Sequence, residues 1–309
     1  MNELLLIEIG GTHTRCAVSS GAADPDRIVV FDNLAHRDPE SVIAAYLDGL
    51  AEVPPTRAAL AVAAPVGPDP LRLTNIDWKV DTARLKRRFG WTAATVINDF
   101  EALACAVPVL SDGELFTIRP GEAASGAPIA VLGPGTGLGV SGLVPCEDTW
   151  FPISGEGGHV TLAAADEHEA EIIATLRREH RHVSAERVLS GAGLLSLYRL
   201  VAEHPRAGSA AAVSRLADAG DRYALDALEQ FFRFLGTVCG DIALTMGARG
   251  GVYLGGGMLP LMKAHLARSG FAQRFLAKGR YQGYLEQIPV RLIVAENPAL
   301  RGIPRHPDV

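Results

Sequence analysis

Short apolar runs separated by glycine turns dominate the start of the chain. Leu4 to Ile9 predicts a buried strand, and after Gly10-Gly11 the chain is expected to return as a second strand at 15–18. Strands in hairpins followed by strands that alternate with helices are typical of an α/β layer. The further strands are expected at 28–31, 58–64 and 95–97, and the helices at 38–50, around 84–87 and at 100–107.

The opening unit recurs in the second half of the chain. A predicted strand at 129–132 runs into the glycine-rich stretch 133–139 and returns as a strand at 140–144. Two such units indicate a duplicated fold with a ligand between the halves. Helices are then expected at 166–180, 193–203, 221–246 (with apolar residues at helical spacing) and from Met258, and strands at 250–254 and 290–294. The stretch 112–127 is the expected domain crossing, and 206–219 carries no chemistry that we can name.

Composition excludes several classes of protein. The 309 residues include 29 basic and 35 acidic side chains, a net charge of −6. An acidic chain argues against nucleic acid as a partner, because neutralising phosphates needs a basic face. No apolar run approaches the ~18 residues that span a bilayer, and the first residues lack the basic region of a signal peptide.

Cysteine usage points to a reducing compartment. The chain holds Cys16, Cys105, Cys146 and Cys239, which lie far apart and form no C-x-x-C pair. A disulfide scaffold or zinc ribbon is therefore not expected. We expect four buried thiols and a cytoplasmic protein.

The glycine-rich stretch at 133–139 opens no predicted helix. Gly137, Gly139 and Gly142 match G-x-G-x-x-G but run into a predicted strand, which excludes a dinucleotide-binding site, and no P-loop pattern occurs. A glycine hairpin can still hold phosphate through bare backbone N–H groups. One such loop is typical of an ordinary turn, whereas two hairpins and a third glycine-rich strand end at 255–257 favour a nucleotide.

Polar side chains at strand and loop ends are the candidates for chemistry. Asn98-Asp99 follows a predicted strand, where a carboxylate could accept a proton from a hydroxyl, although in isolation the pair is more typical of an Asx turn in which Asp99 caps a helix. Glu156 and His159 lie among three glycines and could bond vicinal sugar hydroxyls, the alternative being an exposed turn. Glu186 could add a third contact, although a surface salt bridge explains it better alone. His159 has no partner at zinc-ligand spacing.

These segments occur in the order found in the bacterial glucokinase family, within the hexokinase, actin and heat-shock ATPase superfamily. The resemblance covers essentially the whole chain. The segments that carry it are IEIGGTHTRCAV (7–18), VINDFEALA (96–104), VLGPGTGLGVSGLV (131–144), ISGEGGHV (153–160), SAERVLSGAGLLSLYR (184–199), GGVYLGGGMLP (250–260) and PVRLIVAENPAL (289–300).

The resemblance implies a fold as well as a family. It implies a two-domain actin-like, ribonuclease H-like α/β fold that closes on a hexose, with ATP in the interdomain cleft. The expected small α/β domain is 1–110, to which the tail 297–309 is a possible addition, and the larger α+β domain is 111–296.

The resemblance also implies a role for each candidate residue. Asp99 resembles the general base on the sugar 6-hydroxyl. The hexose-binding set would be Asn98, Glu156, His159 and Glu186; the first phosphate loop Gly10, Gly11 and Thr12; the second Gly135, Thr136 and Gly137; and the nucleotide end Gly255 and Gly256. The implied reaction is in-line transfer of the ATP γ-phosphoryl group to glucose or a related hexose, with Mg²⁺ bridging the phosphates. The resemblance makes a homodimer plausible, whereas the charge and the lack of a long apolar run argue against a nucleic-acid or membrane partner.

Three positions depart from the family pattern. Glu8 stands where an Asp usually faces Mg²⁺ through water, and its extra methylene predicts slower turnover or an altered metal preference. His13 stands where Asn is frequent, so its protonation would make ATP binding pH-dependent. The family usually ends in a helix that packs on the first domain, whereas Pro304 and Pro307 predict no regular helix and a shortened return that loosens closure.

Three other functions stay open from the residues alone. A hexose-binding sensor with weak or no phosphotransfer fits Glu8 and the tail, and is the main alternative. A repressor of the related sugar-kinase group would carry an N-terminal DNA-binding segment, whereas the first predicted strand starts at Leu4. An actin-like ATPase would have no reason to hold Glu156, His159 and Glu186 together.

Overall fold

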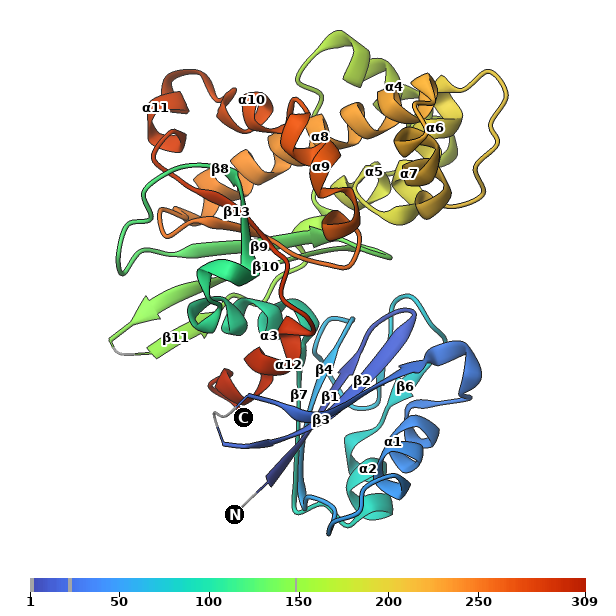
Figure 1. Cartoon of the computed structure of the whole chain (residues 1–309), viewed down its shortest axis with the longest axis vertical. Coiled ribbons are helices and arrows are strands. Elements are labelled where there is room, and N and C mark those ends of the chain that lie inside the picture. The colour runs from blue at the N-terminus through green and yellow to red at the C-terminus, as the bar shows by residue number, and fades with distance from the viewer. Residues whose placement is uncertain (1–2, 22–23, 148) are drawn as a thin grey trace. The chain divides into compact units, whose positions relative to one another are not determined.

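The computed structural model describes residues 3–21, 24–147 and 149–309, and the chain divides into two compact units (Figure 1). The first unit comprises Met1–Ser111, Ser141–Gly155 and Ala295–Val309, and the second comprises Asp112–Val140 and Glu156–Val294. The chain therefore passes between the units more than once. Among the helices of the described residues, none is long and apolar enough to span a membrane.

The first unit is built on a five-stranded sheet of order β3-β2-β1-β4-β7. The strands are β1 (Glu3–Ile9), β2 (His13–Ser20), β3 (Asp26–Asp32), β4 (Arg57–Val62) and β7 (Ala93–Asn98). The first three pair antiparallel, whereas β1, β4 and β7 run parallel. β1 and β4 consist mostly of buried residues, as expected for inner parallel strands that are covered on both faces. All five strands expected from the apolar runs are present.

Capped helices flank this sheet at the expected places. Asp38 and Ser41 form a capping box that starts α1 (Pro39–Asp48), and the Asp81 side chain caps α2 (Thr82–Phe89). Such caps satisfy backbone N–H groups that have no partner within the helix. The unit also contains α3 (Asp99–Ala106), the 3₁₀ turns η1 (Asn33–Ala35) and η2 (Val107–Val109), and the two-stranded ribbon β5 (Leu71–Arg72) and β6 (Lys79–Val80), which the sequence pattern did not predict.

The C-terminal segment packs closely on α3. It forms the short helix α12 (Pro298–Gly302) and the 3₁₀ turn η7 (Ile303–Arg305), so no α-helix continues through 303–309, as the prolines predict. A Cβ on Gly302 would lie 1.7 Å from the carbonyl oxygen of Ala102, a contact that only glycine permits. The return to the first unit is short, as expected, but it is not loose.

The second unit is built on the strands β10-β9-β12-β13-β8. β9 (Ile129–Pro134), β12 (Val252–Leu254) and β13 (Val290–Ile293) run parallel, and β8 (Leu115–Arg119) adds antiparallel to β13. One crossing between the units falls within β10 (Leu138–Cys146), which pairs antiparallel with β11 (Thr149–Pro152) of the first unit. Another crossing falls between Ser111 and Asp112, at the start of the expected stretch 112–127, and that stretch forms the 3₁₀ turn η3 (Asp112–Glu114) and β8 of the second unit.

Helices form most of the remainder of the second unit, and α8 (Arg222–Met246) is its longest. Phe231, Phe232 and Leu235 of α8 are completely buried, which confirms the apolar spacing seen in the sequence. The stretch 206–219, to which we assigned no structure, contains α7, and the helix expected from Met258 starts as a 3₁₀ turn. The other elements are α4 (Glu167–Glu179), α5 (Ala185–Val188), α6 (Gly191–Val201), α7 (Ala210–Asp218), α9 (Lys263–Arg268), α10 (Phe271–Leu276), α11 (Gln282–Leu285), and the turns η4 (Gly157–His159), η5 (Leu259–Met262) and η6 (Gly279–Tyr281).

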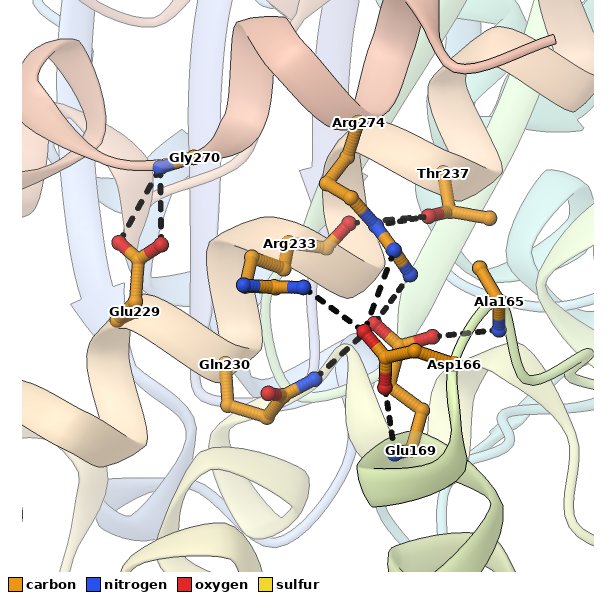
Figure 2. Close-up of polar contacts among 9 residues, drawn as sticks. All are labelled: Ala165, Asp166, Glu169, Glu229, Gln230, Arg233, Thr237, Gly270 and Arg274. Atoms are coloured by element: carbon orange, nitrogen blue, oxygen red, sulfur yellow. Dashed lines mark hydrogen bonds and ion pairs between the residues drawn. The ribbon is translucent and has the colours of Figure 1, made fainter. Parts of the chain in front are cut away.

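A polar network in which Glu169 and Arg274 are buried joins α4, α8 and α10 (Figure 2). Asp166, the N-cap of α4, accepts from Arg233 at 2.8 Å and from Arg274 at 3.4 Å. Glu169, which is 0% exposed, accepts from Arg274 and from Gln230. Two carboxylates and two guanidinium groups balance in charge, so this α4–α8–α10 network serves the fold of the second unit.

The cysteines differ from the expectation at one position. Cys16, Cys105 and Cys239 are buried and all four thiols are free, whereas Cys146 is exposed at the end of β10. Burial raises the pKa of Cys105 to about 12, which keeps this thiol protonated at neutral pH. The prediction of four buried thiols is therefore wrong for Cys146.

Candidate functional site

The first predicted phosphate loop is a tight turn between β1 and β2. The Gly10 N–H donates to the His13 carbonyl at 3.0 Å, and Thr12 and His13 are exposed at the tip. Asn33, only 1% exposed, holds this turn from the neighbouring η1 segment. Its side-chain Nδ2 donates to the Gly10 carbonyl at 2.9 Å, and its backbone N–H donates to the Thr12 carbonyl at 2.9 Å. Its side-chain Oδ1 accepts from the Thr14 hydroxyl at 2.8 Å.

Glu8 lies beside this turn and faces Arg15 across β1 and β2. The two side chains are cross-strand neighbours, with Glu8 Oε1 3.2 Å from Arg15 Nη1. Burial raises the pKa of Glu8, and the nearby Arg15 charge partly offsets that rise. The second oxygen, Oε2, is buried and has no hydrogen-bond partner. A buried carboxylate oxygen without a partner is an observation that fits a hydrated cation.

Among the described residues, no group of three or more His, Cys, Asp or Glu side chains could hold a metal ion. This fits the implied Mg²⁺, because Mg²⁺ is usually held by one or two carboxylates, water and substrate phosphates rather than by a protein cage. The resemblance implies that Glu8 faces Mg²⁺ in the first unit. Its role as a metal residue stays a prediction.

Asn98 and Asp99 mark the junction between β7 and α3. The Asn98 side chain accepts from the N–H groups of Phe100 at 2.8 Å and Glu101 at 3.3 Å, and donates to the Ala64 carbonyl at 3.2 Å. A structural cap is therefore present, but Asn98 provides it rather than Asp99. Asp99 is the first residue of α3, is partly exposed, and also accepts from the Phe100 N–H at 3.0 Å.

The phosphate turn and Asp99 lie at the same edge of the first sheet. In the parallel register, Ile9 of β1 pairs with Val62 of β4, which pairs with Asn98 of β7. The carboxyl ends of these three strands are therefore level, and ligands in open α/β sheets bind at such an edge. The first unit brings Glu8, the 10–12 turn and Asp99 to one side of its sheet.

In the second unit, three of the predicted sugar-binding residues come together. His159 lies with Nε2 3.9 Å from Glu156 Oε2 and with Nδ1 3.9 Å from Glu186 Oε1. The side chains are 48% (Glu156), 50% (His159) and 28% (Glu186) exposed. We call these three residues the open cluster, because the groups are close, accessible and too far apart to hydrogen-bond one another.

Two glycines and one backbone contact hold the open cluster in place. A Cβ on Gly157 would lie 2.8 Å from Val140, and one on Gly158 would lie 2.0 Å from the Leu138 carbonyl oxygen. Glu186 Oε2 accepts from the Leu138 N–H at 2.9 Å. The side chain that Glu186 approaches at 3.9 Å is His159 of the predicted set. The exposed turn proposed as an alternative does form, but it carries this cluster.

The second predicted phosphate loop and the nucleotide end meet at one edge of the second sheet. Leu132 of β9 pairs with Leu254 of parallel β12, so the glycines that follow the two strands are neighbours. A Cβ on Gly133 would lie 2.1 Å from the Gly255 carbonyl oxygen, and Gly256 has a φ of +81°, which favours glycine. Gly135 donates to the Gly137 carbonyl at 2.7 Å, and a Cβ there would meet nothing within 4 Å.

Sequence reasoning missed Asn33 and Gly191. Gly191 donates to the Gly135 carbonyl at 2.9 Å and so supports the second loop. The sequence offered only a weak indication that these two residues support the predicted phosphate loops. Asn33 follows a predicted strand, and Gly191 starts a helix within the segment 184–199 that resembles the family. That the residue groups of the two units act on one ligand stays a prediction.

Comparisons with known proteins extend these observations to the whole chain. The family model described as Glucokinase matches residues 5–306. The glucokinase of Aromatoleum aromaticum is 45% identical over 307 residues, covering 96% of this chain and 92% of the relative. A crystal structure of glucokinase from an Antarctic psychrotroph has a TM-score of 0.84 at 36% identity and covers 98% of both chains.

Some relatives are much longer than this chain. The Burkholderia thailandensis protein named "Bifunctional protein glk" is 40% identical over 304 residues, covering 97% of this chain but 47% of the relative. The chain thus spans about half the length of such curated relatives. The structural likeness confirms the expected two-domain actin-like α/β fold.

Proposed function

The chain belongs to the glucokinase family, and on that premise we propose that it transfers the γ-phosphoryl group of ATP to the 6-hydroxyl of glucose. The family resemblance expected from the sequence is confirmed, and the enzyme class expected with it, a hexose kinase, is part of this proposal. Relatives named glucokinase at 42–45% identity over nearly their full length support the glucokinase function. We place the reaction in the cytoplasm, with glucose and ATP as the small-molecule partners.

One observation carries the proposal: the open cluster places an imidazole between two carboxylates, one on the same glycine turn and one on α5. Carboxylates accept hydrogen bonds from sugar hydroxyls, and a neutral imidazole can both donate and accept. A hydrogen bond to a charged group contributes about 1.5–3 kcal/mol, so a few of them orient a hexose strongly. An ATPase without a sugar substrate gives no reason for this arrangement.

The first unit would supply the group that accepts the hydroxyl proton. Asp99 stands at the carboxyl edge of the sheet, beyond β7, and we assign it as the general base for the 6-hydroxyl. Proton transfer by a positioned side chain typically contributes about 10²–10⁴-fold to rate. Asn98 would be a hexose ligand that also caps α3.

Backbone N–H groups and Glu8 would serve the nucleotide. Gly10, Gly11 and Thr12 in the first unit, and Gly135, Thr136, Gly137, Gly255 and Gly256 in the second, are the proposed contacts to ATP. Glu8 would face Mg²⁺, which when bound neutralises charge on the phosphates. The chain's own contribution is to orient the donor and the acceptor and to exclude water between them.

A hexose sensor with weak phosphotransfer is the second candidate function. The pairing of Glu8 with Arg15 favours it, because a carboxylate engaged by a guanidinium attracts a cation less strongly. The intact open cluster serves either function, so sugar binding alone does not separate them. Turnover does.

The deciding experiment is a coupled assay of glucose 6-phosphate formation with glucose and Mg-ATP. We expect turnover by the wild type and a fall in kcat of about 10²–10⁴-fold in Asp99→Asn, with glucose binding retained in calorimetry. Asp112→Asn, at a 98% exposed side chain, is the matched control and keeps its kcat. Wild-type protein that glucose stabilises but that forms no product would favour the sensor. Asp99→Asn with unchanged kcat would remove Asp99 as the base.

A further inference from the structure

A second carboxylate lies on α3, two residues beyond Asp99, and the proposed chemistry does not use it. Glu101 is 7% exposed, and its Oε2 lies 3.1 Å from Nε2 of His306, which is also 7% exposed. The Ser154 side chain bonds to the same carboxylate. Burial raises the pKa of Glu101, but the bonds from His306 and Ser154 outweigh it, so the net pKa lies below its ordinary value and the group stays ionised.

The hydrogen bonds of His306 define which of its nitrogens carries the proton. The Asp308 N–H donates to Nδ1 at 3.2 Å, so Nδ1 acts as an acceptor and Nε2 donates to Glu101. The segment around His306 is itself anchored, because Arg57 donates to the Val309 carbonyl oxygen at 3.0 Å. Glu101 is therefore held by a fixed partner rather than by a side chain that is free to rotate.

The Glu101 carboxylate joins three segments that are distant in sequence. Its own backbone N–H belongs to the turn capped by Asn98, directly after Asp99. Ser154 lies two residues before Glu156, within the 141–155 segment of the first unit. His306 belongs to the C-terminal segment, whose Gly302 lies against the Ala102 carbonyl oxygen. The first turn of α3 is thus fixed from two sides.

We propose that Glu101 is a positioning residue that sets the orientation of Asp99 by binding Ser154 and His306. The inference rests on the proposed function, because it gives Asp99 a substrate proton to accept. A carboxylate that shifts by about 1 Å can lose 10²-fold in rate, so a bond that fixes the first helical turn acts on kcat. Ser154 connects the same carboxylate to the segment that leads to Glu156.

The test compares two buried carboxylates that each accept hydrogen bonds from side chains of other segments. Glu101→Gln keeps the side-chain volume but places an amide where a carboxylate accepted two bonds, and we expect kcat to fall about 10–100-fold with KM for Mg-ATP unchanged. Glu169→Gln in the α4–α8–α10 network is the matched control, which lowers Tm without changing kcat or KM of the folded protein. His306→Leu should resemble Glu101→Gln, and the double variant should lose no more than either single variant.

Hydrogen exchange tests the contact of Glu101 with Ser154 and His306 by a measurement that does not depend on enzyme activity. In Glu101→Gln we expect amide exchange at 100–103 to accelerate about tenfold relative to the wild type, with exchange in β4 unchanged. If Glu101→Gln keeps the wild-type kcat, as expected for Glu169→Gln, the positioning role is overturned even if Tm falls. If the wild type forms no product, the proposed function fails. The exchange result then decides alone whether Glu101 fixes the turn, and unchanged exchange at 100–103 overturns the inference.

Discussion

The second unit contains two clusters of carboxylates and bases that differ in how they are satisfied. In the α4–α8–α10 network the charged groups are equal in number and in hydrogen-bond contact with one another, and Glu169 and Arg274 are buried. In the open cluster the side chains are accessible and stop at 3.9 Å. A polar cluster that is closed on itself stabilises a fold, whereas one that is held close but left unfilled is suited to a ligand.

The source of rigidity also differs between the clusters. Side chains hold the network together, so removing one of them leaves another charge buried. Backbone holds the open cluster, through the close contacts of Gly157 and Gly158 with β10. A substitution in the network should therefore reduce stability, and one in the open cluster should reduce function.

Arg274→Met should have the largest effect, because it leaves Glu169 charged and without its guanidinium partner in the core. We expect the free energy of unfolding to fall by about 3–5 kcal/mol. Urea unfolding followed by circular dichroism measures this change. Arg268→Met, at an exposed position of α9, is the control and should stay within about 0.5 kcal/mol of the wild type. A comparable loss in both variants would contradict the role of the network.

Glu156→Gln should have the opposite profile. We expect kcat/KM for glucose to fall about 10–100-fold, since a hydrogen bond to a charged group is worth about 1.5–3 kcal/mol, while stability hardly changes. Steady-state kinetics and thermal unfolding of the same preparation measure both quantities. Glu167→Gln, exposed at the start of α4, serves as the control. A large fall in Tm with normal kinetics would assign Glu156 to the fold.

Acid should weaken the network by a smaller amount. The N–H of Glu169, together with Arg274 and Arg233, lowers the pKa of Asp166 below its ordinary value of 3.8. The stabilisation from a lowered pKa is complete above the unfolded-state value and is lost as pH falls toward the folded-state value. We expect Asp166→Asn to be less stable at neutral pH and to lose less stability below about pH 4 than the wild type does. Urea unfolding of both proteins across this pH range measures the change. If the free energy of unfolding depends on pH in the same way in both, this linkage is disproved.

Glu8→Asp should have the smallest effect. Shortening the side chain by one methylene lengthens the gap to Arg15 and restores the residue type usual in the family at this position. We expect kcat to rise by less than about tenfold, under ~1.4 kcal/mol, with a shifted Mg²⁺ dependence. Titrating the rate with Mg²⁺ and Mn²⁺ measures both, and an unchanged or lower kcat would count against a metal-facing Glu8.

Elements with a strong local pattern were predictable from the sequence. Helix α8 followed from its apolar spacing, and β1 from a mostly apolar run that ends at two glycines. Strand β8 was missed because Leu115–Arg119 is stable as a strand only beside β13, a partner that is remote in sequence. Cys146 was misjudged because it lies at the end of β10, past the buried residues of that strand.

The candidate site was predictable in its residue types but not in its supports. Glycines around Glu156 and His159 suggested ligand access, and the structure brings both together with Glu186. The role of Asn33 depends on backbone groups of a turn about twenty residues earlier, which no local pattern reveals. Asn98 rather than Asp99 became the helix cap because the helix starts one residue earlier than the sequence suggested.

The tight contact between α12 and α3 also constrains how the protein is made. Ribosomes deliver Ala102 long before Gly302, so α3 leaves the exit tunnel without the neighbour that covers it. The first unit therefore lacks the contact between α12 and α3 until the second unit has been translated. Its final maturation is therefore a late event in biosynthesis rather than an early one.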